Sequence, residues 1–197
     1  MDFRFAFDFD KTVQAIGVLM KVAQPSGHFP RMNYMRLLKV LYIAERESLG
    51  ETGHPILGAT IYAMERGPVM DEIYALMKGQ SFHAPEFQKY FVRDHYAIAM
   101  IDDPGNGDLT EYEIAKIQEV EERYADRDEW DMVNICHELQ EWKKNDPGKS
   151  CKTIPLRDIL DAVGISGDEA DLLIADAKSQ QDADLALRAV QSDRTRK

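Results

Sequence analysis

One segment of the chain, residues 33–50, constrains the fold more than any other. It reads NYMRLLKVLYIAERESLG, and its apolar residues lie around most of the circumference of a helix. A helix of this kind has to be surrounded by other elements that bury it. The basic residues Arg36, Lys39 and Arg46, with Glu47, fall on one narrow stripe of this helix, and we interpret that stripe as a solvent-exposed edge.

Helical periodicity recurs on both sides of this central segment. Asp10 is a candidate N-cap for the first helix, which the sequence PSGHFP (25–30) ends, and Thr110 and Glu113 have capping-box spacing. The further predicted helices cover residues 10–24, 110–124, 128–145, 154–164 and 166–177. Beyond Ser179 the chain is polar, with one short helix possible before a frayed end.

Two runs rich in β-formers predict a small sheet. They are HPILGATIYAME (54–65) and RDHYAIAMID (93–102), and they are candidates for an antiparallel pair. The expected fold is therefore mainly α with a small antiparallel β-sheet (α+β), in a compact single helical domain.

The junction between Gly67 and Pro68 has a structural interpretation that needs no ligand. Proline suits the first position of a helix and glycine can occupy the cap, while Asp71 and Glu72 would lie in the positively polarised first turn. The apolar spacing that follows, ended by Gly79, predicts a short helix. We expect substitution of Gly67 to destabilise the protein rather than to remove a contact with a partner.

Composition and charge exclude several classes of function. With 35 acidic and 24 basic residues the formal net charge is -11, so a protein that coats nucleic acid is not expected. No apolar run is long enough to cross a bilayer, and the N-terminus resembles no signal peptide. Cys136 and Cys151 match no metal-binding spacing, so we expect reduced thiols and a cytoplasmic location.

No pattern of residues predicts an enzyme. The motif HELQE at His137 has Glu141 where a zinc protease has its second histidine, which favours a buried or capping role for His137. There is no glycine-rich phosphate loop and no nucleophile elbow, and Cys136 and His137 would point to different faces of their helix. We expect no catalytic residue, no metal and no cofactor.

Two motifs together resemble a known family. In residues 37–79 the pattern runs through Lys-x-Leu-Tyr, a Thr-Gly-x-Pro turn, and Ala-x-x-x-Gly-Pro-Val before Ile-Tyr; further along, a histidine is followed by a tryptophan. The chain closely resembles the Panacea domain of SocA-like antitoxins and phage-associated GepA-like proteins, over about Phe9 to Lys144. The matching residues are Lys39, Leu41, Tyr42, Thr52, Gly53, Pro55, Ala63, Gly67, Pro68, Val69, Ile73, Tyr74, His137 and Trp142.

This resemblance implies a type II antitoxin that binds and neutralises a cognate protein toxin without catalysis. It also implies an adaptor role, in which the toxin is delivered to the ClpXP protease. Residues 1–149 would form the Panacea-like antitoxin domain, and 150–197 a helical extension with a polar tail, packed on that domain up to about residue 178. The alternative functions are a phage or mobile-element accessory protein with another protein partner and, less favoured, an enzyme.

The residues proposed to contact the toxin are the three cations of the central helix, Arg36, Lys39 and Arg46. An exposed arginine in an acidic protein can form a bidentate contact with a partner's carboxylate. The competing interpretation pairs these cations with carboxylates of the same chain. No membrane partner and no direct nucleic-acid partner are expected.

Overall fold

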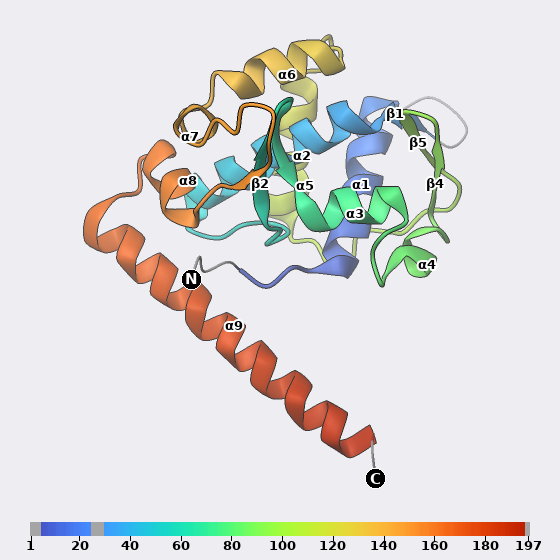
Figure 1. The fold of residues 1–197 in the computed structure, drawn as a ribbon. Coiled ribbons are helices and arrows are strands. Elements are labelled where there is room, and N and C mark those ends of the chain that lie inside the picture. The colour runs from blue at the N-terminus through green and yellow to red at the C-terminus, as the bar shows by residue number, and fades with distance from the viewer. Residues whose placement is uncertain (1–4, 25–29, 196–197) are drawn as a thin grey trace.

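The computed structural model describes residues 5–24 and 30–195, and all side chains in these ranges except those of residues 180–181 and 184–195. Helices dominate this part of the chain (Figure 1). They are α1 (Phe9–Ala23), α2 (Tyr34–Thr52), α3 (Asp71–Lys78), α4 (Ala84–Phe87), α5 (Glu111–Arg123), α6 (Glu129–His137), α7 (Gln140–Lys144), α8 (Leu156–Ala162) and α9 (Gly167–Thr195). The strands are β1 (Arg31–Asn33), β2 (Ile61–Met64), β3 (Gly67–Met70), β4 (Phe91–Asp94), β5 (Ala97–Met100) and β6 (Lys152–Thr153).

The strands form two small antiparallel sheets, with the orders β1-β5-β4 and β3-β2-β6. The predicted class, mainly α with a small antiparallel β component, is confirmed. The predicted pairing between residues 54–65 and 93–102 is wrong, because β2 and β5 belong to different sheets. Strand β2 pairs instead with β3, and β5 with β4, each across a two-residue turn. Closing such a short loop costs less chain entropy than pairing strands that are far apart in sequence.

The expected strand at 54–65 begins only at Ile61, and residues 54–60 are a loop held by α2. The buried carboxylate of Glu45 accepts hydrogen bonds from the backbone N–H groups of Ile56 and Leu57 at 2.8 Å and of Gly58 at 2.7 Å. These amides are therefore unavailable for a β-ladder. Burial raises the pKa of Glu45 to about 7, and the amide hydrogen bonds oppose that shift.

Helix α2 is central, as its sequence predicts. It lies in the middle of the molecule and contacts α1, α5, α6, α8 and β3 (Figure 1). Asn33 caps its N-terminus by accepting from the N–H of Met35 at 2.8 Å. Its last turn ends at Gly53, which is in the left-handed conformation with φ 76°.

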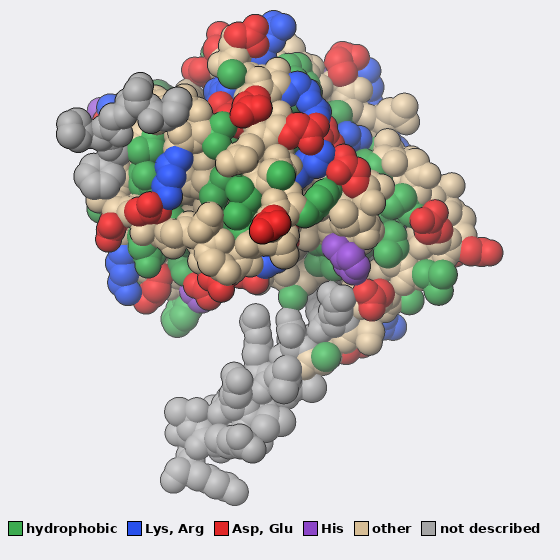
Figure 2. Space-filling view, turned by 180° about the vertical axis from the view of Figure 1, so that it is seen from behind, with side chains coloured by type: hydrophobic (Ala, Val, Ile, Leu, Met, Phe, Trp, Pro, Cys, Tyr) green, Lys and Arg blue, Asp and Glu red, His purple; other side chains and the backbone are tan. Residues whose placement is uncertain are grey.

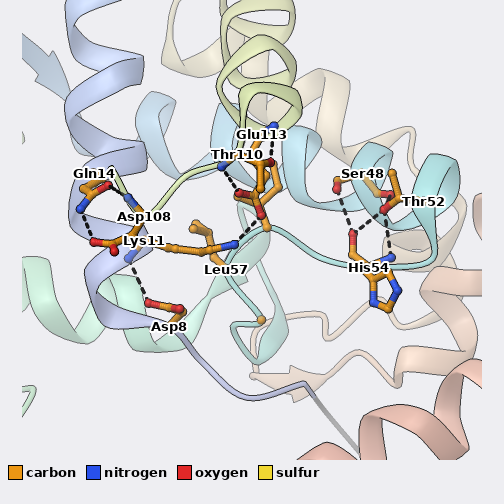
Figure 3. Close-up of polar contacts among 12 residues, drawn as sticks. Asp8, Lys11, Gln14, Ser48, Thr52, His54, Leu57, Asp108, Thr110 and Glu113 are labelled. Carbon is orange, nitrogen blue, oxygen red and sulfur yellow. Dashed lines mark hydrogen bonds and ion pairs between the residues drawn. The ribbon is translucent and has the colours of Figure 1, made fainter. Parts of the chain in front are cut away.

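Helices α1 and α5 pack together and are tied by polar contacts near their N-terminal ends (Figure 3). Lys11 donates to Glu113 at 2.7 Å, and Glu113 also completes the predicted capping box with Thr110. The cap of α1 is Asp8 and not Asp10, since Asp8 accepts from the N–H of Lys11 at 3.0 Å. The break predicted for PSGHFP lies, apart from Pro30, outside the described residues.

The predicted helix at 128–145 is interrupted. Asp128 caps α6, which ends at His137, and α7 starts after Leu139, whose backbone is extended. No glycine or proline marks this interruption in the sequence.

The C-terminal elements add to the second sheet and then leave the body of the molecule. Strand β6 pairs with β2, and α8 packs on α7 and α2. Helix α9 continues to Thr195 and extends away from the other elements (Figure 1), so residues 180–195 are helical where the sequence predicted one short helix and a frayed end. Residues 178–195 contain no glycine or proline that would stop the helix.

Candidate partner-binding surface

The β2–β3 hairpin is the point where the family-motif residues of distant segments converge. Glu65 and Arg66 form its exposed turn, and Met64 pairs with Gly67. Gly67 has φ 93°, and a Cβ at this position would lie 3.2 Å from the Cβ of Cys136. The expectation that Gly67 and Pro68 cap a helix is wrong: they begin β3, and α3 starts at Asp71. The predicted need for glycine remains, because this backbone conformation favours it.

Lys39 contacts the hairpin from the interior of the protein. Its side chain is 1% exposed, and its Nζ donates to the carbonyl oxygen of Pro68 at 2.6 Å. Burial lowers the pKa of Lys39 to about 8. Burial also raises the pKa of the neighbouring Cys136 thiol to about 11, so this thiol is not a reactive nucleophile at neutral pH.

His137 and Trp142 contact the backbone of the hairpin next to its turn. Their rings stack with centroids 4.1 Å apart and an interplanar angle of 18°. The Nε2 of His137 lies 3.1 Å from the carbonyl oxygen of Glu65, and the Nε1 of Trp142 donates to that of Met64 at 3.1 Å. Because a carbonyl only accepts, the Nε2 of His137 carries the proton in this contact.

The interruption between α6 and α7 makes this stacking possible. On a continuous helix, two residues five apart are rotated by about 140° about the axis and do not face each other. The extended residue Leu139 turns the chain so that both rings meet at the hairpin. The histidine and the tryptophan of this motif therefore do not share one face of a helix. They stack on each other and each contacts a backbone carbonyl oxygen of the hairpin.

A buried polar network joins α2 to α7 next to the stacked rings of His137 and Trp142. Glu141, whose side chain is 0% exposed, accepts from the hydroxyl of Tyr42 at 2.8 Å and from the Nε of Arg46 at 2.7 Å. Burial and the nearby Glu141 carboxylate raise the pKa of Tyr42 well above its ordinary value. The network fixes the position of α7, and with it the position of Trp142.

The predicted exposed edge of α2 is wrong. Arg36 is 9% exposed and Lys39 1%, and the side chain of Arg46 is 16% exposed. Arg36 pairs with Glu121 at 2.8 Å and donates to the carbonyl oxygens of Tyr124 and Arg127, both at 2.8 Å, so it caps the C-terminal end of α5. These cations bind carboxylates and carbonyls of their own chain. Direct contact between the three side chains and a partner stays an untested prediction, and their burial removes the argument for it.

Four further motif residues lie in the core, on α3 or where α2 ends. Leu41 lies in the core, and Tyr74 packs against the core from α3, with the Nζ of Lys78 4.9 Å from its ring centroid. Gly53 ends α2, and Pro55 lies in the loop that follows it.

Two exposed residues at the hairpin were missed by the sequence analysis. The guanidinium of Arg66 lies over the ring of Trp130, 5.0 Å from its centroid, and Trp130 is 52% exposed. We name Glu65, Arg66 and Trp130 the hairpin-tip surface. A signal was present, since Trp130 lies in the first turn of α6 between Glu129 and Asp131, where a core tryptophan is not expected.

The wider surface mixes charges of both signs. On the face turned away from the viewer of Figure 1, Asp and Glu side chains are interspersed with Lys and Arg (Figure 2). Within the described residues there is no group of three or more His, Cys, Asp or Glu placed to hold a metal ion. In the same part of the chain no helix has the length and apolarity needed to cross a membrane.

Comparisons with known proteins agree with the resemblance noted from the sequence. Searches of curated proteins and of solved structures returned no match. A family model described as "Antitoxin SocA-like, Panacea domain" matches residues 37–143, more than half of the chain. This range begins later than Phe9, but it contains all of α2 except its first three residues, together with the β2–β3 hairpin, His137 and Trp142. The chain therefore belongs to the SocA-like antitoxin family that carries the Panacea domain.

Proposed function

We propose that this protein is the antitoxin of a toxin-antitoxin pair, and that it binds and neutralises a protein toxin without catalysing a reaction. Membership in the SocA-like antitoxin family carries this proposal. The proposal places the chain in the cytoplasm, where both of its cysteines, which are free in the structure, would stay reduced.

We further propose the hairpin-tip surface as the place where the toxin docks. Tryptophan and arginine dominate the binding energy of many protein interfaces, and here the two already stack on each other. The turn is held from within by Lys39, His137 and Trp142, so little conformational entropy is lost when a partner binds. Glu65 and the α6 cap Asp128 are exposed beside Arg66 and Trp130, which favours a toxin surface with basic groups.

Co-expression tests the function. The protein encoded beside this chain is expressed alone and together with the chain, and bacterial growth is measured. Growth arrest by the neighbour alone, relieved by co-expression, is the expected result. If the neighbour is harmless when expressed alone, or if co-expression does not restore growth, the antitoxin proposal is wrong.

Two variants test the docking site. Arg66→Ala and Trp130→Ala should keep the melting temperature of the parent, since both side chains are exposed, but they should lose rescue of growth. Phe82→Ala is the matched control, because Phe82 is 92% exposed and lies outside the hairpin-tip surface. Full rescue of growth by both hairpin-tip variants would show that the toxin binds elsewhere on the protein. The proposed antitoxin function would then still stand.

A host that lacks ClpXP distinguishes the two modes of neutralisation. If the antitoxin delivers its toxin to this protease, growth should fail in the deficient host even with the parent chain present. If the antitoxin blocks the toxin directly, growth should be restored in both hosts.

A further inference from the structure

A second cluster, in which half-buried rings lie beside exposed side chains, is on different elements from the hairpin-tip surface. It contains three tyrosines, from the first turn of α2, from α3 and from the β4–β5 turn. The ring of Tyr34 is 6.4 Å from the ring of Tyr96 and 6.4 Å from that of Tyr74, measured between centroids. Tyr96 is 71% exposed. With Lys78 and Arg93, which lie over two of these rings, we name this cluster the tyrosine surface.

The two cations of the tyrosine surface each lie over a tyrosine ring. The guanidinium of Arg93 lies 5.4 Å from the ring centroid of Tyr34, and the Nζ of Lys78 lies 4.9 Å from that of Tyr74. Neither forms an ion pair with any carboxylate in the ranges that the structure describes, although the chain has 35 acidic and only 24 basic residues. Both charges are therefore available to a carboxylate that comes from outside.

The cluster is held in place by its own backbone contacts. The N–H of Tyr34 donates to the carbonyl oxygen of Tyr96 at 2.9 Å, which ties the β4–β5 turn to the start of α2. His95, in that turn, has φ 53°, and its carbonyl oxygen accepts from the Nε of Arg93 at 3.0 Å. This bond fixes the guanidinium and leaves its two terminal amino groups free to face a carboxylate.

We propose that the tyrosine surface binds a short acidic segment of a second protein partner. Carboxylates of the segment would contact Arg93 and Lys78, and an apolar or aromatic side chain beside them would pack on Tyr96. Tyrosine and arginine together are typical of protein interfaces. Tyrosine rings can also stack on nucleic-acid bases, but a nucleic-acid strand is held by contacts to many phosphates, and this cluster offers only the two cations Lys78 and Arg93. This site is separate from the proposed toxin site, so its test does not depend on the toxin.

Fluorescence polarisation with the full chain at low salt tests the proposal. The probes are a fluorescein-labelled peptide of repeated Gly-Asp-Glu-Trp units, the same peptide with Asn and Gln in place of the acids, and labelled oligothymidylate. The acidic peptide should bind about tenfold or more tightly than the neutral one, and added salt should weaken its binding. Failure of the acidic peptide to bind, or preferential binding of oligothymidylate, overturns the proposal.

Variants then locate the binding site. Arg93→Glu and Lys78→Glu should each weaken binding of the acidic peptide by about tenfold or more at an unchanged melting temperature. Lys143→Glu is the matched control: it changes the net charge equally, but Lys143 lies on α7 and is 52% exposed beside Glu138. If Lys143→Glu weakens binding as much as the other two, the effect comes from net charge and no site exists at the tyrosines.

Discussion

The Nζ of Lys39 donates to the carbonyl oxygen of Pro68 at 2.6 Å in a site from which water is excluded. This contact joins the central helix to the first residues of β3, directly behind the exposed turn of Glu65 and Arg66. It also gives the protein a buried cation whose charged form is disfavoured, since burial lowers the pKa of Lys39 to about 8.

Stability should therefore rise with pH on the alkaline side through Lys39. Between about 8 and the ordinary lysine value of 10.5, the unfolded chain binds a proton at Lys39 that the folded chain has lost. Rising pH then favours the folded state. We expect the free energy of unfolding of the parent to increase across this window relative to that of Lys39→Met, which has no such proton. Denaturant unfolding of both proteins at several pH values measures the difference, and a constant difference would contradict the assignment.

Gly67→Ala should destabilise the protein by about 1–3 kcal/mol, because the substitution combines backbone strain with close packing. The added Cβ would lie 3.2 Å from Cys136 and from the Nζ of Lys39, at φ 93°. Gly105→Ala is the control, since Gly105 has φ 73° but no atom within 4 Å of the added Cβ. Thermal unfolding should show the larger loss for Gly67→Ala. Equal losses would mean that strain alone acts at Gly67.

Arg46→Glu should unfold or strongly destabilise the protein, by on the order of 3–5 kcal/mol, because it leaves the buried Glu141 without its cation. An exposed contact residue, as the sequence predicted Arg46 to be, could instead be substituted at an unchanged melting temperature. Lys143→Glu breaks an exposed pair and should cost under about 1 kcal/mol. A parent-like melting temperature for Arg46→Glu would show that the pair with Glu141 contributes little.

Truncation tests how much of residues 150–197, which we propose as an extension packed on residues 1–149, the protein needs for folding. Among the side chains that the structure describes, the last buried one in α9 is Ala177. Removal of residues 180–197 should therefore leave cooperative melting intact. Truncation before Ile159 should abolish it, because Ile159 and Leu160 are buried. Loss of cooperativity on removing 180–197 alone would show that the end of α9 is needed for folding.

The elements predicted best are those whose signals are local. The apolar pattern of residues 33–50 identified the central helix, and the capping box of Thr110 and Glu113 identified the start of α5. The same patterns could not identify the residues with which the polar side chains of α2 interact. Arg36 meets Glu121 and Arg46 meets Glu141, and these partners come 85 and 95 residues later in the chain.

For the candidate site, the sequence identified the residues that support the hairpin but not the exposed residues that we propose to contact a partner. Gly67 and Pro68 precede two acidic residues, and this pattern fits the start of a helix as well as a strand of a hairpin. Only the pairing of this segment with β2 shows that it is a strand. The ring stacking of His137 and Trp142 depends on an interruption of the helix that no glycine or proline announces. Arg66 and Trp130 come together from segments 64 residues apart, so their contact has no local sequence signal.

The long separations of the α2 contacts also bear on the order of events during synthesis. While the ribosome is still translating the middle of the gene, α2 has emerged with Arg36, Tyr42 and Arg46 but without Glu121 and Glu141. A helix that is apolar on most sides and carries unpaired cations is prone to associate with other chains until its partners arrive. The polar side chains of α2 therefore stay unpaired until residues 121–141 have been synthesised, and nascent chains that stop short of Glu141 should be the ones that chaperones bind.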